Sequence, residues 1–102
     1  MTVEELKELV EKGETPVVLD VREAHELQIA AFPMPVIHIP LGSLPSRLAD
    51  LPKDAHIVCA CRSGSRSAQA VMFLRQRGFD AVNLEGGILA WARRVDPNVR
   101  QY

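Results

Sequence analysis

The stretch IVCACRSGSRSAQAV, residues 57–71, passes from a short apolar run through a polar loop into a helical pattern. A short apolar run bounded by turn residues is typical of a buried β-strand, and the serines, glycine and arginines that follow it are typical of a loop. Apolar residues then return at helical spacing as far as Gly78, a residue type that commonly ends a helix. The stretch and its flanks therefore predict a strand over 56–60 and a helix over 65–78.

The same alternation of short apolar runs and helical stretches extends over the rest of the chain. Alternating strands and helices are the pattern of a parallel sheet covered by helices on both faces, and the continuous apolar character of the runs fits that burial. We therefore expect an α/β fold with a central parallel sheet of four or five strands. The other expected strands are 16–21, 36–39 and 81–84, and the other expected helices are 3–12, 22–30, 43–51 and 86–95.

Local signals place some of these boundaries. Thr2 followed by Glu5 is the pattern of a capping box, which predicts that a helix begins at residue 3. Two prolines interrupt regular structure, so residues 32–35 are expected to form a loop.

The composition is that of an ordinary globular domain. The 102 residues are enough for one compact domain, so we expect a single domain over 1–102. Hydrophobic residues make up 47% and the net charge is −1, which gives no reason to expect a nucleic-acid or membrane partner. The N-terminal segment is acidic and amphipathic, unlike a signal peptide. We therefore expect a cytoplasmic protein with reduced thiols. A monomer is the default expectation for one small domain.

Both cysteines of the chain, Cys59 and Cys61, lie in the opening stretch, two positions apart. Residues i and i+2 of a strand point to the same face, with Cα atoms too far apart for an unstrained disulfide. A zinc site needs about four ligands, and His25, His38 and His56 are scattered, so no metal is expected. Cys59, inside the apolar strand, is expected to be a core residue. Cys61 is left as the candidate for thiolate chemistry.

Cys61 follows a predicted strand and precedes a predicted helix. Unpaired backbone N–H groups and the helix dipole converge there and stabilise a negative charge, so we expect a lowered thiol pKa. Gly64 permits backbone conformations closed to other residues, while serine hydroxyls and arginine guanidiniums add hydrogen-bond donors and positive charge. The pattern predicts a cradle for a thiolate or a bound anion. Its other members are Arg62, Ser63, Ser65, Arg66 and Ser67.

Four motifs carry a resemblance to a known family: VVLDVRE (17–23), HIP (38–40), CRSGSRS (61–67) and NLEGGILAW (83–91). They occur in the order seen in single-domain rhodaneses, the rhodanese-type sulfurtransferases, and the chain resembles that family from about residue 2 to residue 94. The resemblance implies a small rhodanese-like α/β domain, in agreement with the strand and helix pattern. One segment departs from the family, because the GHIPGA element of many members is absent from IAAFPMPVIHIPLGS (29–43).

The resemblance also implies an activity. Cys61 matches the family's catalytic cysteine, which would take the outer sulfur of an anionic donor such as thiosulfate, or of a persulfide, and carry it as a cysteine persulfide. The sulfur would pass to an acceptor such as cyanide or a thiol, with no metal or organic cofactor. Residues 61–66 would cradle the persulfide and bind substrate. Asp20 and Arg22 match the family's DVR motif and are expected to support the loop, although a surface ion pair at a strand end would give the same pattern.

Other functions remain to be weighed against sulfur transfer. Related phosphatases and arsenate reductases resemble Cys-x5-Arg with a histidine before the cysteine, whereas this chain has Cys-x4-Arg between Cys61 and Arg66 and places Ala60 before the cysteine. The shorter loop favours sulfur over a tetrahedral phosphate.

A second alternative is a non-catalytic rhodanese-like interaction module, but such a domain would typically lack the cysteine. Relay of sulfur to a protein partner stays open. Gly86 and Gly87 match the family's glycine pair, and we expect them to allow a tight turn and close packing, because glycine has no Cβ. Trp91 is expected to lie in the core.

Overall fold

Four short parallel strands form the centre of the computed structural model, which describes residues 1–102. Their order across the sheet is β2-β1-β3-β4. Because the strands are parallel and β1 pairs with β3, the loops that follow these two strands lie next to each other at the carboxyl edge of the sheet. The strands are β1 (Val17–Asp20), β2 (Ile37–His38), β3 (His56–Ala60) and β4 (Asp80–Asn83).

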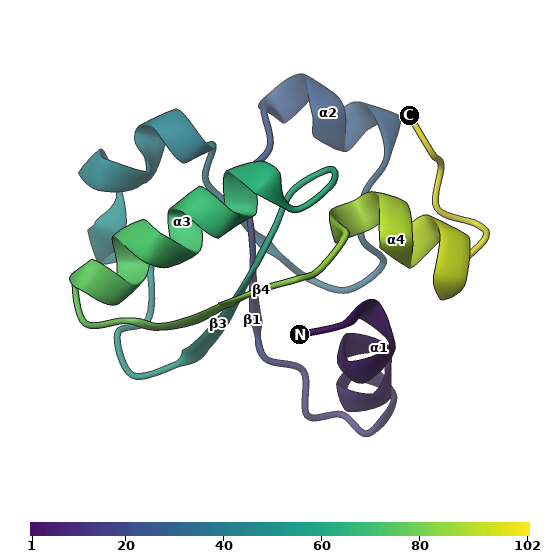
Figure 1. The fold of residues 1–102 in the computed structure, drawn as a ribbon, viewed down its shortest axis with the longest axis horizontal. Helices are drawn as coiled ribbons and strands as arrows, with labels where there is room; N and C mark the ends of the chain where they lie inside the picture. The colour runs from purple at the N-terminus through teal and green to yellow at the C-terminus, as the bar shows by residue number, and fades with distance from the viewer.

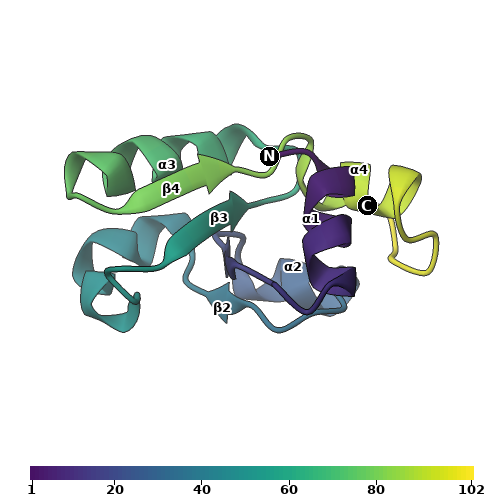
Figure 2. The same cartoon turned by 90° about the horizontal axis from the view of Figure 1, so that it is seen from below.

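Four α-helices surround the sheet. Helix α3 lies on one side of the strands, and α1 and α4 lie on the other (Figure 1). Helix α2 connects β1 to β2 (Figure 2). None of the helices combines the length and apolar character that crossing a bilayer requires. The helices are α1 (Val3–Glu11), α2 (Ala24–Ile29), α3 (Ser65–Gln76) and α4 (Gly87–Arg94).

Each face of the sheet packs against its own layer of helices. Leu19 and Cys59 point to one face, where they join a core cluster with Leu74 of α3. Their neighbours Val18 and Val58 point to the other face, because successive side chains of a strand alternate. The predicted α/β fold, with a parallel sheet covered on both faces, is therefore confirmed. The second cluster is completed from α1 and α4 by Leu6, Ile88 and Trp91.

The predicted elements around the opening stretch are confirmed. Strand β3 covers residues 56–60, and α3 begins at Ser65. Gly78 follows α3 with a φ of 84°, the left-handed backbone expected after a helix end. The predicted capping box is also present at the start of α1, where Thr2 Oγ1 accepts the backbone N–H of Glu5 at 3.1 Å.

The expected α-helix over 43–51 is wrong. Two 3₁₀ helices, η1 (Leu41–Ser46) and η2 (Leu48–Asp50), occupy this part of the chain. Pro45 lies inside η1, and proline has no N–H to donate and clashes with the preceding turn of an α-helix. Leu44, Leu48 and Leu51 are spaced by four and three residues, which is a helical pattern, but this spacing does not take account of Pro45.

Candidate active site

The residues from Cys61 to Gly64 connect β3 to α3. Gly64 is the N-cap of α3 and has a φ of +107°, a left-handed value that side chains rarely adopt. In this conformation its backbone N–H donates to Cys61 Sγ at 3.0 Å. The sulfur therefore lies at the positive end of the α3 dipole, as the strand–loop–helix pattern predicts.

Cys61 is as buried as Cys59, with 1% and 0% of its surface exposed, so hydrogen bonding rather than burial distinguishes the two thiols. The Ser67 hydroxyl, in the first turn of α3, lies 3.3 Å from Cys61 Sγ. Burial by itself raises the pKa of the Cys61 thiol, but hydrogen bonds from Ser67 and from the backbone N–H groups of the loop outweigh it. The pKa of Cys61 is therefore lowered from its ordinary value.

Cys59 has the opposite electrostatics. It lies in the core between the sheet and α3, and burial raises the pKa of its thiol to about 12. A thiol with such a pKa is protonated at neutral pH and is a poor nucleophile. The prediction that Cys59 is a core residue is confirmed.

Asp20 and Arg22 form a buried ion pair at the carboxyl end of β1, with 1% and 0% of their surfaces exposed. Asp20 Oδ1 accepts the backbone N–H and the Nε–H of Arg22, each at 3.0 Å, and Oδ2 accepts from Nη2 at 2.8 Å. The pair is therefore part of the interior and not a surface pair at a strand end. Its carboxylate holds the arginine in one orientation through both oxygens.

A second set of contacts connects Arg22 to the cysteine loop. Arg22 Nη1 donates to the Tyr102 hydroxyl at 2.9 Å, and that hydroxyl donates to Glu26 Oε1 at 2.9 Å. Glu26 also accepts hydrogen bonds from both terminal nitrogens of Arg66, at 2.6 and 2.8 Å. The Arg62 guanidinium lies 4.9 Å from the centre of the Tyr102 ring. The two loop arginines are therefore placed by residues of α2 and of the C-terminal segment.

The contact with Arg66 makes Glu26 more acidic than an ordinary glutamate. Hydrogen bonds from the Arg66 guanidinium lower the pKa of Glu26 from 4.5 to about 2. Because the pKa is depressed in the folded state, the ion pair stabilises the fold above the unfolded value of 4.5, and this contribution is lost as the pH falls towards 2.

We therefore predict that Glu26→Gln is less sensitive to acid than the native protein. Its free energy of unfolding, measured in urea between about pH 5 and about pH 3, should fall less steeply, because the variant takes up no proton at this position when it unfolds. Glu11→Gln removes an exposed carboxylate without an ion pair and should follow the native curve. Parallel curves for native protein and Glu26→Gln would contradict the prediction.

Gly87 brings the start of α4 against the cysteine loop. A Cβ at this position would lie 2.5 Å from the carbonyl oxygen of Cys61 and 2.6 Å from that of Arg62, and φ is +58°. Its absence allows Ile88 and Leu89 to donate their backbone N–H groups to the same two carbonyls, at 2.9 and 3.0 Å. The close packing expected of the glycine pair is therefore confirmed at Gly87, and α4 fixes the backbone that carries Cys61.

Sequence reasoning missed three residues of this site. Asn83 contacts Gly64 of the loop, Glu26 contacts Arg66, and Tyr102 contacts Arg62. All three are distant in the chain from the residues that they contact. Asn83 belongs to the NLEGGILAW motif, which could have drawn attention to it. Glu26 reads as an ordinary helix carboxylate, and no local pattern marks Tyr102.

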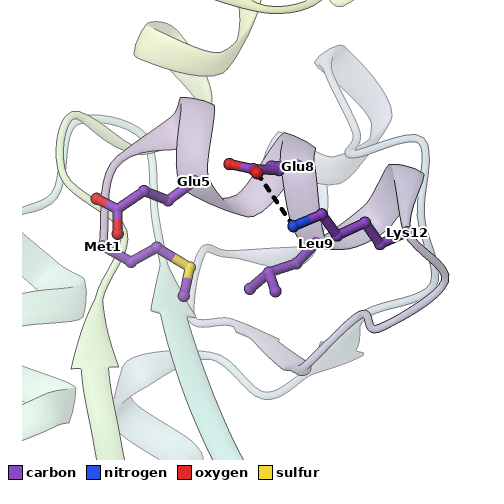
Figure 3. Close-up of a pocket in the computed structure, with 5 residues that line it drawn as sticks. All are labelled: Met1, Glu5, Glu8, Leu9 and Lys12. Carbon is purple, nitrogen blue, oxygen red and sulfur yellow. Dashed lines mark ion pairs between the residues drawn. The ribbon is translucent and has the colours of Figure 1, made fainter.

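The two hollows on the surface lie away from Cys61. One, of about 220 Å³, is lined by α1 and contains the exposed Glu8–Lys12 ion pair, whose atoms are 3.1 Å apart (Figure 3). The other, of about 550 Å³, lies beside η2 and includes Lys53 and Phe79. The candidate site is thus defined by its hydrogen bonds rather than by a cavity.

The fold and the loop define a class: small parallel α/β proteins that carry a cysteine thiol among backbone donors at a helix start. Residues 2–94 match the rhodanese-like domain family, and the chain belongs to that family. It is 40% identical over 92 residues to "Putative sulfurtransferase YtwF" of Bacillus subtilis, covering 90% of this chain and 88% of the relative. A rhodanese-related protein from Thermoplasma volcanium has a TM-score of 0.86 and 34% identity, with coverage of 100% of this chain and 97% of that one.

Some relatives are much longer than this chain. It is 37% identical to "Adenylyltransferase and sulfurtransferase MOCS3-1" of Zea mays, and the match covers all of this chain but only 23% of that protein. Relatives of both sizes are named for sulfur transfer. The family and these names support a sulfur-transfer role for the chain.

Proposed function

We propose that the protein is a sulfurtransferase that moves a sulfane sulfur from an anionic donor, such as thiosulfate or a persulfide, to cyanide or a thiol. The carrier is a persulfide on Cys61. The observation that carries the proposal is the pair of donors at Cys61 Sγ, the Gly64 N–H at 3.0 Å and the Ser67 hydroxyl at 3.3 Å, which lower the thiol pKa at the start of α3.

Two displacements at sulfur complete the cycle. The Cys61 thiolate attacks the outer sulfur of thiosulfate, the S–S bond of the donor breaks, and its electron pair leaves with sulfite. The acceptor then attacks the outer sulfur of the persulfide, and the electron pair of the S–S bond returns to Sγ as a thiolate. Such a covalent intermediate gives ping-pong kinetics.

Neither step requires a general base next to the cysteine. No histidine or carboxylate is hydrogen-bonded to Cys61 Sγ, whose donors are Gly64 and Ser67. Donors are what an anionic sulfur needs, both as a thiolate and as the outer atom of a persulfide. The backbone N–H groups at Ser63 and Ser65 belong to the same cradle in this proposal.

The two loop arginines have different parts in the proposal. The exposed Arg62 guanidinium lies over the Tyr102 ring but has no ion-pair partner, so it can attract an anionic donor. Arg66 is held by both oxygens of Glu26, so it contributes its backbone and keeps α2 against the loop. The buried Asp20–Arg22 pair supports this arrangement through Tyr102 and Glu26.

Two alternatives use the same loop. Phosphatase or arsenate-reductase chemistry is disfavoured because Arg66, which would clamp the oxyanion, is engaged by Glu26. Relay of the Cys61 sulfur to a protein acceptor is the second candidate. It is favoured by the match to a long relative that is named both adenylyltransferase and sulfurtransferase.

The intact mass of the protein after incubation with thiosulfate tests the proposal. We expect the mass to increase by one sulfur atom, and the added sulfur to be lost on treatment with cyanide or a thiol. Phosphatase activity towards an aryl phosphate should be absent. An unchanged mass with both thiosulfate and a low-molecular-weight persulfide would overturn sulfur transfer.

A further inference from the structure

The Ser67 hydroxyl has one proton and two acceptors within reach. Its Oγ lies 2.6 Å from Asn83 Oδ1 and 3.3 Å from Cys61 Sγ. Ser67 is completely buried, so its hydroxyl is engaged within the protein. The two acceptors belong to different elements, since Asn83 ends β4 and Cys61 follows β3. The proton can serve only one of them at a time.

The orientation of the Asn83 amide follows from its other contact. Asn83 Nδ2 lies 3.0 Å from the carbonyl oxygen of Gly64, which can only accept a hydrogen bond. The NH₂ group therefore faces Gly64, and Oδ1 faces Ser67. An amide oxygen cannot donate, so the Ser67 proton points either to Asn83 or to the Cys61 sulfur.

We propose that Asn83 is a positioning residue that accepts the Ser67 hydrogen bond whenever the Cys61 sulfur carries no charge. For its place in a reaction cycle, this inference rests on the proposed sulfur transfer. In the thiolate, the Ser67 hydroxyl donates to Sγ. Once the persulfide forms, the negative charge moves to the outer sulfur, Sγ becomes neutral, and the hydroxyl turns to Asn83 Oδ1. When the acceptor removes the outer sulfur, the electron pair returns to Sγ and the hydrogen bond returns with it.

The geometry makes Asn83 and the thiolate competitors. A short hydrogen bond at 2.6 Å must be given up before Ser67 can stabilise the charged sulfur at 3.3 Å. Asn83 therefore favours the neutral sulfur, while the hydroxyl that it orients favours the charged one. Removing the competing acceptor should make the thiol more acidic. Loosening the loop, by contrast, would withdraw the Gly64 N–H and make the thiol less acidic.

Titration of Asn83→Ala tests the inference, with the thiolate followed by its ultraviolet absorbance and no sulfur donor present. We expect the pKa of Cys61 to fall by about half a unit to one unit, the effect of one hydrogen bond. Cys59 does not interfere, because burial raises its pKa to about 12. A raised or unchanged pKa of Cys61 in Asn83→Ala would overturn the inference.

The same substitution in a Ser67→Ala background is the control. Without the hydroxyl there is no proton to redirect, so Asn83→Ala should leave the pKa of Cys61 unchanged there. An equal shift in both backgrounds would also overturn the inference. Asn83→Val, which carries a β-branched side chain suited to a strand, gives the same comparison if the alanine variant does not fold.

The titration tests the role of Asn83 and the mass experiment tests sulfur transfer, so either result can be negative without the other. The pKa is read on the reduced protein, whereas sulfur loading is read as a change of mass on the native chain. A protein that titrates as expected but takes no sulfur from thiosulfate or a persulfide would contradict the proposed function and leave the competition for the Ser67 proton standing.

Discussion

Cys61→Ser is expected to lower the turnover of thiosulfate and cyanide by more than about a thousandfold, because the substitution removes the nucleophile itself. A serine hydroxyl is not ionised at neutral pH and does not form a persulfide. Gly64 and Ser67 remain in place to donate to the new oxygen, so the fold should be retained. The measurements are thiocyanate formation, intact mass after thiosulfate, and circular dichroism.

Cys59→Ala is the matched control for this prediction. Cys59 lies two residues away, is fully buried in the same core cluster and makes no hydrogen bond through its sulfur. Alanine keeps the site apolar, so turnover should stay within a few-fold of the native value, with a modest loss of stability. Loss of turnover in a folded Cys59→Ala protein would contradict the assignment of the sulfur carrier to Cys61.

Asp20→Ala is expected to lower the free energy of unfolding by about 3–5 kcal/mol, because it leaves the charge of Arg22 buried and unpaired. Arg22 is 0% exposed and directs its Nε and Nη2 groups and its backbone N–H to the Asp20 carboxylate. The whole free energy of unfolding of a small domain is only about 5–15 kcal/mol. Urea denaturation followed by circular dichroism measures the loss.

Asp50→Ala provides the comparison with an exposed pair. Asp50 accepts from Arg47 Nε at 2.9 Å, but the two side chains are 52% and 43% exposed. Solvent screens such a pair, and its loss should cost about 0–1 kcal/mol. Similar losses of stability in Asp20→Ala and Asp50→Ala would contradict the prediction that the buried ion pair contributes more to the free energy of unfolding than the exposed one.

Much of the fold follows from local sequence signals. Apolar runs over 16–21 and 56–60 predict β1 and β3, and Thr2 with Glu5 predicts the start of α1, because strand periodicity and capping act over a few residues. The helix expected over 43–51 fails for an equally local reason, since Pro45 excludes α-helical hydrogen bonding at that point. Predicting these elements therefore requires no knowledge of contacts between residues that are distant in the chain.

The residues next to Cys61 in the chain could be predicted as site residues, whereas their partners from distant parts of the chain could not. Cys61, Gly64 and Ser67 lie within seven consecutive residues, and the chemistry of a thiol at a helix start follows from that order. The engagement of Arg66 by Glu26 was not predictable, because its partner is 40 residues earlier in the chain. A free arginine and a paired one look the same in sequence.

The sequence by itself determined the strand–loop–helix unit, the thiol at its turn and the small residues that let the loop close, because these depend on neighbours along the chain. Only the tertiary structure decided which groups act on that thiol. Parallel pairing of β3 with β4 brings Asn83 to the Ser67 hydroxyl, and the C-terminal segment brings Tyr102 to Arg62 and Glu26. Hydrogen bonds reach about 3 Å, so partners so distant in sequence meet only once the sheet and its helices have packed.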